Sequence, residues 1–163
     1  DSTSIIFCYS LGKAQRLLSE LSCQNFKNIY IHKSINKMNK IYKKLGIELT
    51  EVKILDNDLP INNIKNSLLL LPPALNNKNF LKKFKSVKTG FASGWMSIRA
   101  FKKRSGFDKG FPISDHADWN GLIKTIRDSE ATQIFLNHGD GECLANFLRE
   151  KENLNIKQLN QVQ

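Results

Sequence analysis

The stretch Ser67-Leu68-Leu69-Leu70-Leu71 is a continuous apolar run that ends at Pro72-Pro73. Proline lacks the backbone N–H that a central strand needs, so the two prolines end the run as a strand. The run does not alternate between apolar and polar residues, which is typical of a strand buried on both faces of a parallel sheet. This segment therefore predicts an α/β fold with helices on both sides of the sheet.

Strand and helix patterns alternate along the rest of the chain. The predicted strands lie at residues 4–9, 28–32, 67–71, 86–93, 111–113, 134–136 and, as an edge strand, 156–159. The predicted helices lie at about 11–21, 35–45, 79–84, 118–128 and 141–151. Repeated strand–helix units predict a three-layer α/β sandwich with a mostly parallel sheet. The strands expected to share that sheet are Ile5–Cys8, Ile29–Ile31, Leu68–Leu71 and Val87–Phe91.

Two of the three histidines lie between Gly110 and Glu142: His116 in Ser-Asp-His-Ala-Asp and His138 in Asn-His-Gly-Asp. Each follows a short apolar run and precedes a helical pattern. If the two strands are parallel neighbours, both turns emerge on one edge of the sheet, where α/β proteins build their sites. Imidazole and carboxylate together suit a divalent metal or a phosphate. The alternative is two polar turns with incidental histidines.

The positive charge is concentrated between Lys82 and Lys109, where the single acid is Asp108 and aromatic residues are interleaved. Such a basic strip can hold the backbone of a polyanion and stack its bases, or it is a solvated lysine-rich surface. Trp95 in this strip is either a stacking platform or part of the core, and the large size of Trp favours the core.

The turn from Tyr9 to Gln15 lacks the glycine spacing of a dinucleotide site and the GK[ST] of a P-loop. A tight strand-to-helix turn that uses the backbone freedom of Gly12 is favoured over a phosphate site.

The composition excludes some classes of protein. No apolar run approaches the roughly 20 residues of a membrane-spanning helix. Cys8, Cys23 and Cys143 form neither a CxxC pair nor an even set, which predicts reduced, buried thiols and a cytoplasmic protein.

Three motifs carry a family resemblance: FCYSLGKAQRLL (7–18), FASGWMSIRAFKKRSGFDKGFPISDHADWNGLI (91–123) and FLNHGD (135–140). In this order and spacing they closely resemble the bacterial DNA ligase-associated exonucleases. These are metallo-β-lactamase-fold nucleases with a β-CASP domain, relatives of ribonuclease J and of the mRNA 3′-end-processing endonuclease. The resemblance covers nearly the whole chain and is weakest between Ile47 and Asn66.

The resemblance implies two zinc ions held between the metallo-β-lactamase lobe and the β-CASP lobe, with nucleic acid threaded through the cleft between these lobes. His138 matches the histidine of the third β-CASP motif, which ligates a metal. His116 matches that of the second motif, which faces the scissile phosphate as a phosphate binder or general acid. By the same resemblance, Ser114 lies near the phosphate.

Further roles are implied for neighbouring residues. Asp115 acts with Ser114 and His116 at the catalytic turn, and Asp115 and Asp118 orient the histidines. Asp140 lies behind the metal ligands. The basic strip, and not the resemblance, supplies the expected contacts with nucleic acid: Arg99, Lys102, Lys103 and Arg104.

The chain departs from the family pattern, because the HxHxDH signature, which supplies most metal ligands, is absent. The later His and Asp ligands of the amino-terminal lobe and the acidic first β-CASP motif are absent too. The remaining histidine, His32, has no ligand-like neighbours. We therefore expect the carboxy-terminal part of such an enzyme, with a β-CASP-like domain at residues 1–109 and, at 110–163, the segment that returns to the metallo-β-lactamase lobe. Its zinc site should be incomplete, and the chain alone inactive.

These inferences predict part of a metal-dependent DNA exonuclease that hydrolyses phosphodiester bonds at DNA ends during DNA repair or processing. Expected partners are single-stranded DNA or DNA ends, together with a DNA ligase and a helicase of the same pathway, and no membrane. The alternatives are a non-catalytic nucleic-acid-binding module and an RNA-processing nuclease of the same superfamily.

Overall fold

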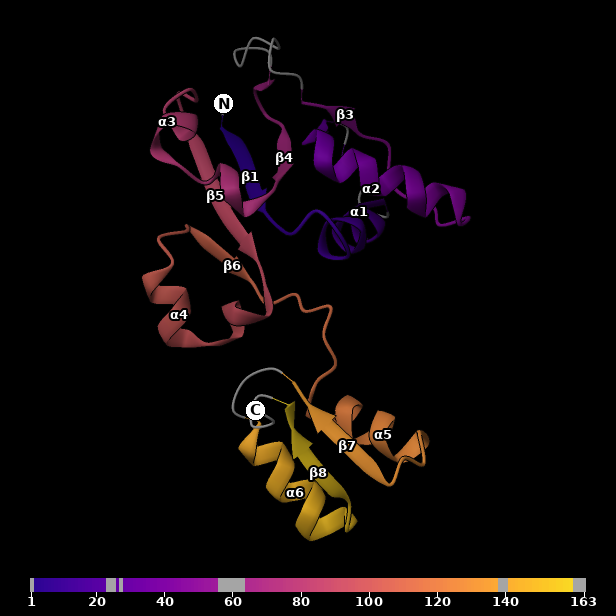
Figure 1. The fold of residues 1–163 in the computed structure, drawn as a ribbon. Helices are drawn as coiled ribbons and strands as arrows, with labels where there is room; N and C mark the ends of the chain where they lie inside the picture. The colour runs from indigo at the N-terminus through magenta and orange to yellow at the C-terminus, as the bar shows by residue number, and fades with distance from the viewer. Residues whose placement is uncertain (1, 23–25, 27, 56–63, 138–140, 160–163) are drawn as a thin grey trace. The chain divides into compact units, whose positions relative to one another are not determined.

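The computed structural model describes residues 2–22, 26, 28–55, 64–137 and 141–159 (Figure 1). The chain forms two compact units, Asp1–Asp115 and His116–Gln163. The predicted boundary between Lys109 and Gly110 instead falls within a strand of the first unit, β6 (Lys109–Phe111). The assignment of the two parts to a β-CASP domain and a metallo-β-lactamase lobe stays a prediction.

The first unit contains a six-stranded sheet in the order β3-β2-β4-β1-β5-β6, and every neighbouring pair is parallel. Its strands are β1 (Thr3–Phe7), β2 (Ile29–Ile31), β3 (Lys53–Ile54), β4 (Leu68–Leu71), β5 (Val87–Ala92) and β6. The prediction that the first, second, fourth and fifth of these share one parallel sheet is confirmed. The short edge strand β3 was not predicted.

Helices cover both faces of this sheet, which confirms the three-layer α/β fold. On one face, Leu68 and Leu70 pack in a cluster with Leu18 of α1 (Lys13–Ser22) and Ile35 of α2 (Lys33–Lys44). On the other face, Leu69 and Leu71 pack with residues around η2 (Pro73–Leu75) and α3 (Lys78–Leu81). Since alternate residues of a strand point to opposite faces, the unbroken leucine run supplies both cores.

The connection between β5 and β6 contains η3 (Gly94–Ser97) and α4 (Arg99–Arg104) (Figure 1). Every residue of α4 is exposed, so the helix has no buried face within the first unit.

The second unit is a small α/β unit with its own parallel pair of strands. It contains α5 (Trp119–Asp128), β7 (Gln133–Leu136), α6 (Glu142–Glu152) and β8 (Asn155–Gln158), and β7 pairs with β8. Its core is built from Ile123, Ala145, Leu148 and Ile156. Cys143 is exposed, because it lies two residues before the buried Ala145 and so on another side of α6. The prediction of buried thiols is wrong for Cys143 and confirmed for Cys8, and Cys23 lies outside the described residues.

Within the described ranges, no helix is both long and apolar enough to cross a membrane.

His32 has a structural role at the start of α2. Its Nδ1 accepts a hydrogen bond from the backbone N–H of Ser34 (3.2 Å) and lies 2.7 Å from the Ser34 hydroxyl. Burial, and then the charge of Lys33, hold the pKa of His32 below its usual range. The neutral imidazole is thus the form that caps the helix.

The lowered pKa of His32 predicts a loss of stability in acid. The unfolded chain binds a proton at this imidazole more readily than the folded chain does, so the stabilisation is present above the unfolded pKa of about 6.5 and is lost as the pH falls through the folded pKa. Thermal melts at neutral and mildly acidic pH should show a smaller drop in Tm for His32→Asn, which caps a helix without titrating. Equal drops in variant and wild type would contradict this role.

Candidate active site

The predicted tight turn between β1 and α1 is confirmed, with Gly12 at φ +79°. The next residue, Lys13, is only 4% exposed, which is rare for a lysine. Its Nζ atom lies 2.6 Å from Oδ1 of Asp115 and 4.9 Å from the ring centroid of Tyr9. Lys13, which could have bound a phosphate at this turn, is therefore paired with Asp115 of the Ser-Asp-His-Ala-Asp motif.

The backbone of the motif is held by the same helix. Arg16, one turn after Gly12, donates a hydrogen bond from Nη1 to the carbonyl oxygen of Ser114 (2.8 Å). A Cβ atom on Gly12 would lie 2.8 Å from Oδ2 of Asp115, so the glycine gives the carboxylate room. The start of α1 therefore holds both Ser114 and Asp115, and this role of Lys13 and Arg16 was not predicted from the sequence.

Ser114 also contacts the turn that follows β5. A Cβ atom on Gly94 would lie 3.3 Å from both Cβ and Oγ of Ser114. The Ser114–Asp115 segment thus passes over the carboxyl ends of β1 and β5, which are neighbours in the sheet. After β1 the chain continues to β2, toward one edge of the sheet, and after β5 it continues to β6, at the opposite edge. Such a point, where neighbouring connections diverge, is where open α/β sheets bind ligands.

Cys8 is also at this end of β1, but it is not a reactive thiol. Burial raises its pKa to about 12, although the charge of Lys13 acts in the opposite direction. At neutral pH the side chain is a protonated thiol packed in the core, unsuited to nucleophilic attack or metal ligation.

His116 and Asp118 belong to the second unit, and both are exposed. The Oδ1 atom of Asp118 accepts a hydrogen bond from the backbone N–H of Gly121 (2.8 Å) and so caps α5. The expected role of Asp118 in orienting a histidine stays a prediction, as does the role of His116.

His138 and Asp140 lie outside the described residues, so their predicted roles are untested. The condition set for their convergence, that the two histidines follow parallel neighbouring strands, is not met by the described strands. The strand before His116 is β6 of the six-stranded sheet, whereas the strand before His138 is β7, which pairs with β8 in a separate sheet. Apolar patterns identified both strands but contain no information about which sheet each one joins.

The residues that the structure describes do not form a metal site by themselves. Among them, no group of three or more His, Cys, Asp or Glu side chains comes close enough to hold an ion. This part of the chain does not build a dinuclear zinc centre.

The four predicted nucleic-acid contacts, Arg99, Lys102, Lys103 and Arg104, are brought together on α4 and are all exposed. The expectation that Trp95 belongs to the core is wrong, because 61% of it is exposed. The adjacent Met96 takes the buried position instead, with 4% exposed.

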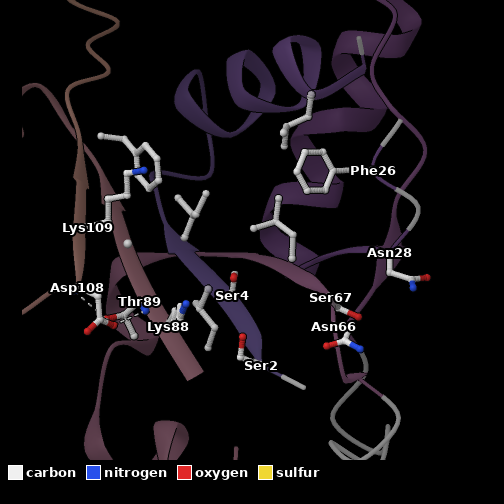
Figure 2. Close-up of a pocket in the computed structure, with 16 residues that line it drawn as sticks. Ser2, Ser4, Phe26, Asn28, Asn66, Ser67, Lys88, Thr89, Asp108 and Lys109 are labelled. Carbon is white, nitrogen blue, oxygen red and sulfur yellow. Dashed lines mark hydrogen bonds between the residues drawn. The ribbon is translucent and has the colours of Figure 1, made fainter. Parts of the chain in front are cut away.

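A pocket of about 800 Å³ lies at the opposite ends of the same strands (Figure 2). Its lining includes Ser2, Asn28 and Ser67, which directly precede β1, β2 and β4. Because α/β sheets act at the carboxyl ends of their strands, this pocket is separate from the candidate site.

No protein-family model matches the chain. The chain is similar to a protein of Opitutus terrae described as a probable DNA ligase, with 26% identity over 151 residues. The match covers 93% of this chain and 14% of that protein, so the chain spans a small part of the relative's length.

The contact between Gly12 and Asp115 predicts unequal effects of two glycine substitutions. Gly12 and Gly46 both have φ +79°, but no atom lies within 4 Å of a Cβ placed on Gly46. Each Gly→Ala change should cost about 1–3 kcal/mol for the left-handed backbone. Gly12→Ala should cost about 1 kcal/mol more, because its methyl group crowds Asp115. Urea unfolding of both variants measures the difference, and equal losses would mean that the carboxylate moves aside freely.

The ion pair predicts a specific pattern in a double-mutant cycle. Asp115→Asn leaves the Lys13 cation buried without a counter-charge and should lower the free energy of unfolding by about 1–3 kcal/mol, since the exposed carboxylate is partly screened by water. Lys13→Met in the same chain removes that charge and should restore most of the loss. Denaturant unfolding of the wild type, both single variants and the double variant gives the coupling energy. Additive losses would show that the pair does not hold the segment.

Proposed function

We propose that this chain is part of a metal-dependent DNA exonuclease that hydrolyses phosphodiester bonds at DNA ends. The observation that carries the proposal is the placement of Ser114 and Asp115. Both lie over the carboxyl ends of β1 and β5, held by the Lys13 ion pair and the Arg16 hydrogen bond. The first two residues of a motif that resembles a nuclease motif thus lie at the edge of the sheet where α/β enzymes act, which supports the proposal.

Two further observations support DNA as the substrate. The relative from Opitutus terrae, described as a probable DNA ligase, matches almost the whole chain. The exposed helix α4 carries four basic residues and no acid, which suits a phosphate backbone. The proposed partners are therefore single-stranded DNA or DNA ends, with a DNA ligase of the same pathway.

In the proposed site, Ser114 lies near the scissile phosphate and His116 faces it as a phosphate binder or general acid. A positioned imidazole can donate a proton to the leaving oxygen. We propose Asp115 as a positioning residue, because its carboxylate is paired with Lys13 at 2.6 Å and so holds the backbone directly before His116.

Zinc is the proposed metal, with His138 as a ligand and Asp140 next to the ligands. An imidazole is a common zinc ligand, but structural and catalytic sites need at least three protein ligands. Since the described residues form no such cluster, the other ligands in this proposal come from elsewhere in the intact enzyme.

The non-catalytic alternative retains the same DNA-binding surface. The basic helix α4 favours nucleic-acid binding whether or not hydrolysis occurs. A protein that binds single-stranded DNA but does not hydrolyse it with zinc present would be a binding module.

Two histidine variants of the intact protein test the proposal, and His32→Asn serves as the control because His32 caps α2. His138→Ala should lower zinc content and nuclease activity together, since a ligand is lost. His116→Ala should leave zinc content near normal and lower the rate by about 10²–10⁴-fold, the usual contribution of a general acid. Zinc is measured by mass spectrometry and activity by nucleotide release from single-stranded DNA. Full activity in both variants would rule out this assignment.

A further inference from the structure

Trp95 and Phe101 form an exposed aromatic pair beside the basic helix α4. Their ring centroids are 5.7 Å apart with an interplanar angle of 29°, a stacked arrangement. Trp95 is 61% exposed and Phe101 is 40% exposed. Stacking on each other buries only part of two rings that are normally among the most buried side chains of a protein.

The pair rests on a well-anchored turn. Met96 is buried and packs against β6 so closely that a Cβ on Gly110 would lie 2.6 Å from its Sδ atom. The hydroxyl of Ser93, itself 2% exposed, accepts a hydrogen bond from the backbone N–H of Trp95 (3.4 Å). With Ser93 and Met96 fixed, the Trp95 side chain points outward from a rigid support.

The charge around the pair selects one kind of partner. Arg99, Lys102, Lys103 and Arg104 lie on the same short helix as Phe101, and α4 contains no acidic residue. An apolar protein surface placed on the rings would bring these cations out of water without counter-charges, which is costly. A single strand of nucleic acid offers flat bases for the rings and phosphates for the cations. In a duplex the base faces are already stacked on each other, so the pair suits a single strand or a frayed end.

We propose that Trp95 and Phe101 are a base-stacking platform for single-stranded DNA, with the α4 cations on its backbone. The inference rests on the proposed function and adds the location of the strand. Gly94, adjacent to Trp95, lies close enough to Ser114 that a Cβ atom on it would be 3.3 Å from the Ser114 hydroxyl oxygen, so the proposed strand runs beside the Ser114–Asp115 segment. The platform thus adds a base contact beside Ser114 and Asp115 within the first unit.

The experiment compares two ligands of equal length: oligo(dT) of about 10 nucleotides, within the usual site size, and an abasic deoxyribose-phosphate strand. The wild-type chain should bind oligo(dT) about 5- to 100-fold more tightly, the usual effect of stacking one base. Trp95→Ala should lose most of this preference while its affinity for the abasic strand stays unchanged. Trp95→Phe, which keeps a ring, should retain much of it.

A charge variant is the matched control. Lys102→Glu together with Lys103→Glu should weaken binding of both strands equally and lower the salt dependence. The slope of log K against log salt should fall by about 0.7 for each phosphate that the variant no longer neutralises. A fall in the oligo(dT) preference in this variant, with none in Trp95→Ala, would overturn the platform.

Fluorescence tests the platform without altering it, which covers the case of a Trp95→Ala variant that fails to fold. The chain has two tryptophans, so Trp119→Phe leaves Trp95 as the single reporter. Oligo(dT) should quench its emission, and the abasic strand should not. Equal quenching by both strands would overturn the proposal, as would an unchanged preference for oligo(dT) in a folded Trp95→Ala variant. Either result leaves nuclease activity in the intact protein as a separate question, answered by the histidine variants.

Discussion

The part-buried ion pair between Lys13 and Asp115 is the interaction on which the arrangement of the candidate site depends. It joins residues 102 positions apart, at the first turn of α1 and just beyond β6. Lys13 is almost fully buried, so displacing Asp115 would leave a cation in the protein interior without a counter-charge. This cost, together with the Arg16 hydrogen bond and the close approach at Gly12 and Gly94, fixes the backbone that leads into His116.

The sequence predicted the central part of the fold because its signals are local and strong. Four consecutive leucines followed by two prolines specify a short strand buried on both faces, and β4 is such a strand. Weak signals were missed. A two-residue strand such as β3 has no period to detect, and α4 has no buried face to give an apolar stripe. Trp95 was misplaced because Met96 takes the core position beside it.

The candidate site could be predicted only in part. The motif residues and their place at the carboxyl edge of a sheet follow from apolar runs and turn residues, and Ser114 and Asp115 lie there. The partner of Asp115 could not be predicted, since a pairing across the length of the first unit leaves no local pattern. The sequence also could not predict that β6 and β7 belong to two different sheets, because a strand's own residues do not specify which strand pairs with it.

The central position of β1 affects how the chain folds as the ribosome releases it. β1 is among the first residues of the first unit to be made, yet both of its neighbours, β4 and β5, come at least 60 residues later. The ion pair of Lys13 forms later still, because Asp115 is made 102 residues after Lys13. The second unit pairs β7 with β8 across one helix and closes over a short distance. Because pairing between distant segments is slow, β1 joins its sheet partners late in synthesis, whereas β7 and β8 can pair soon after β8 is made.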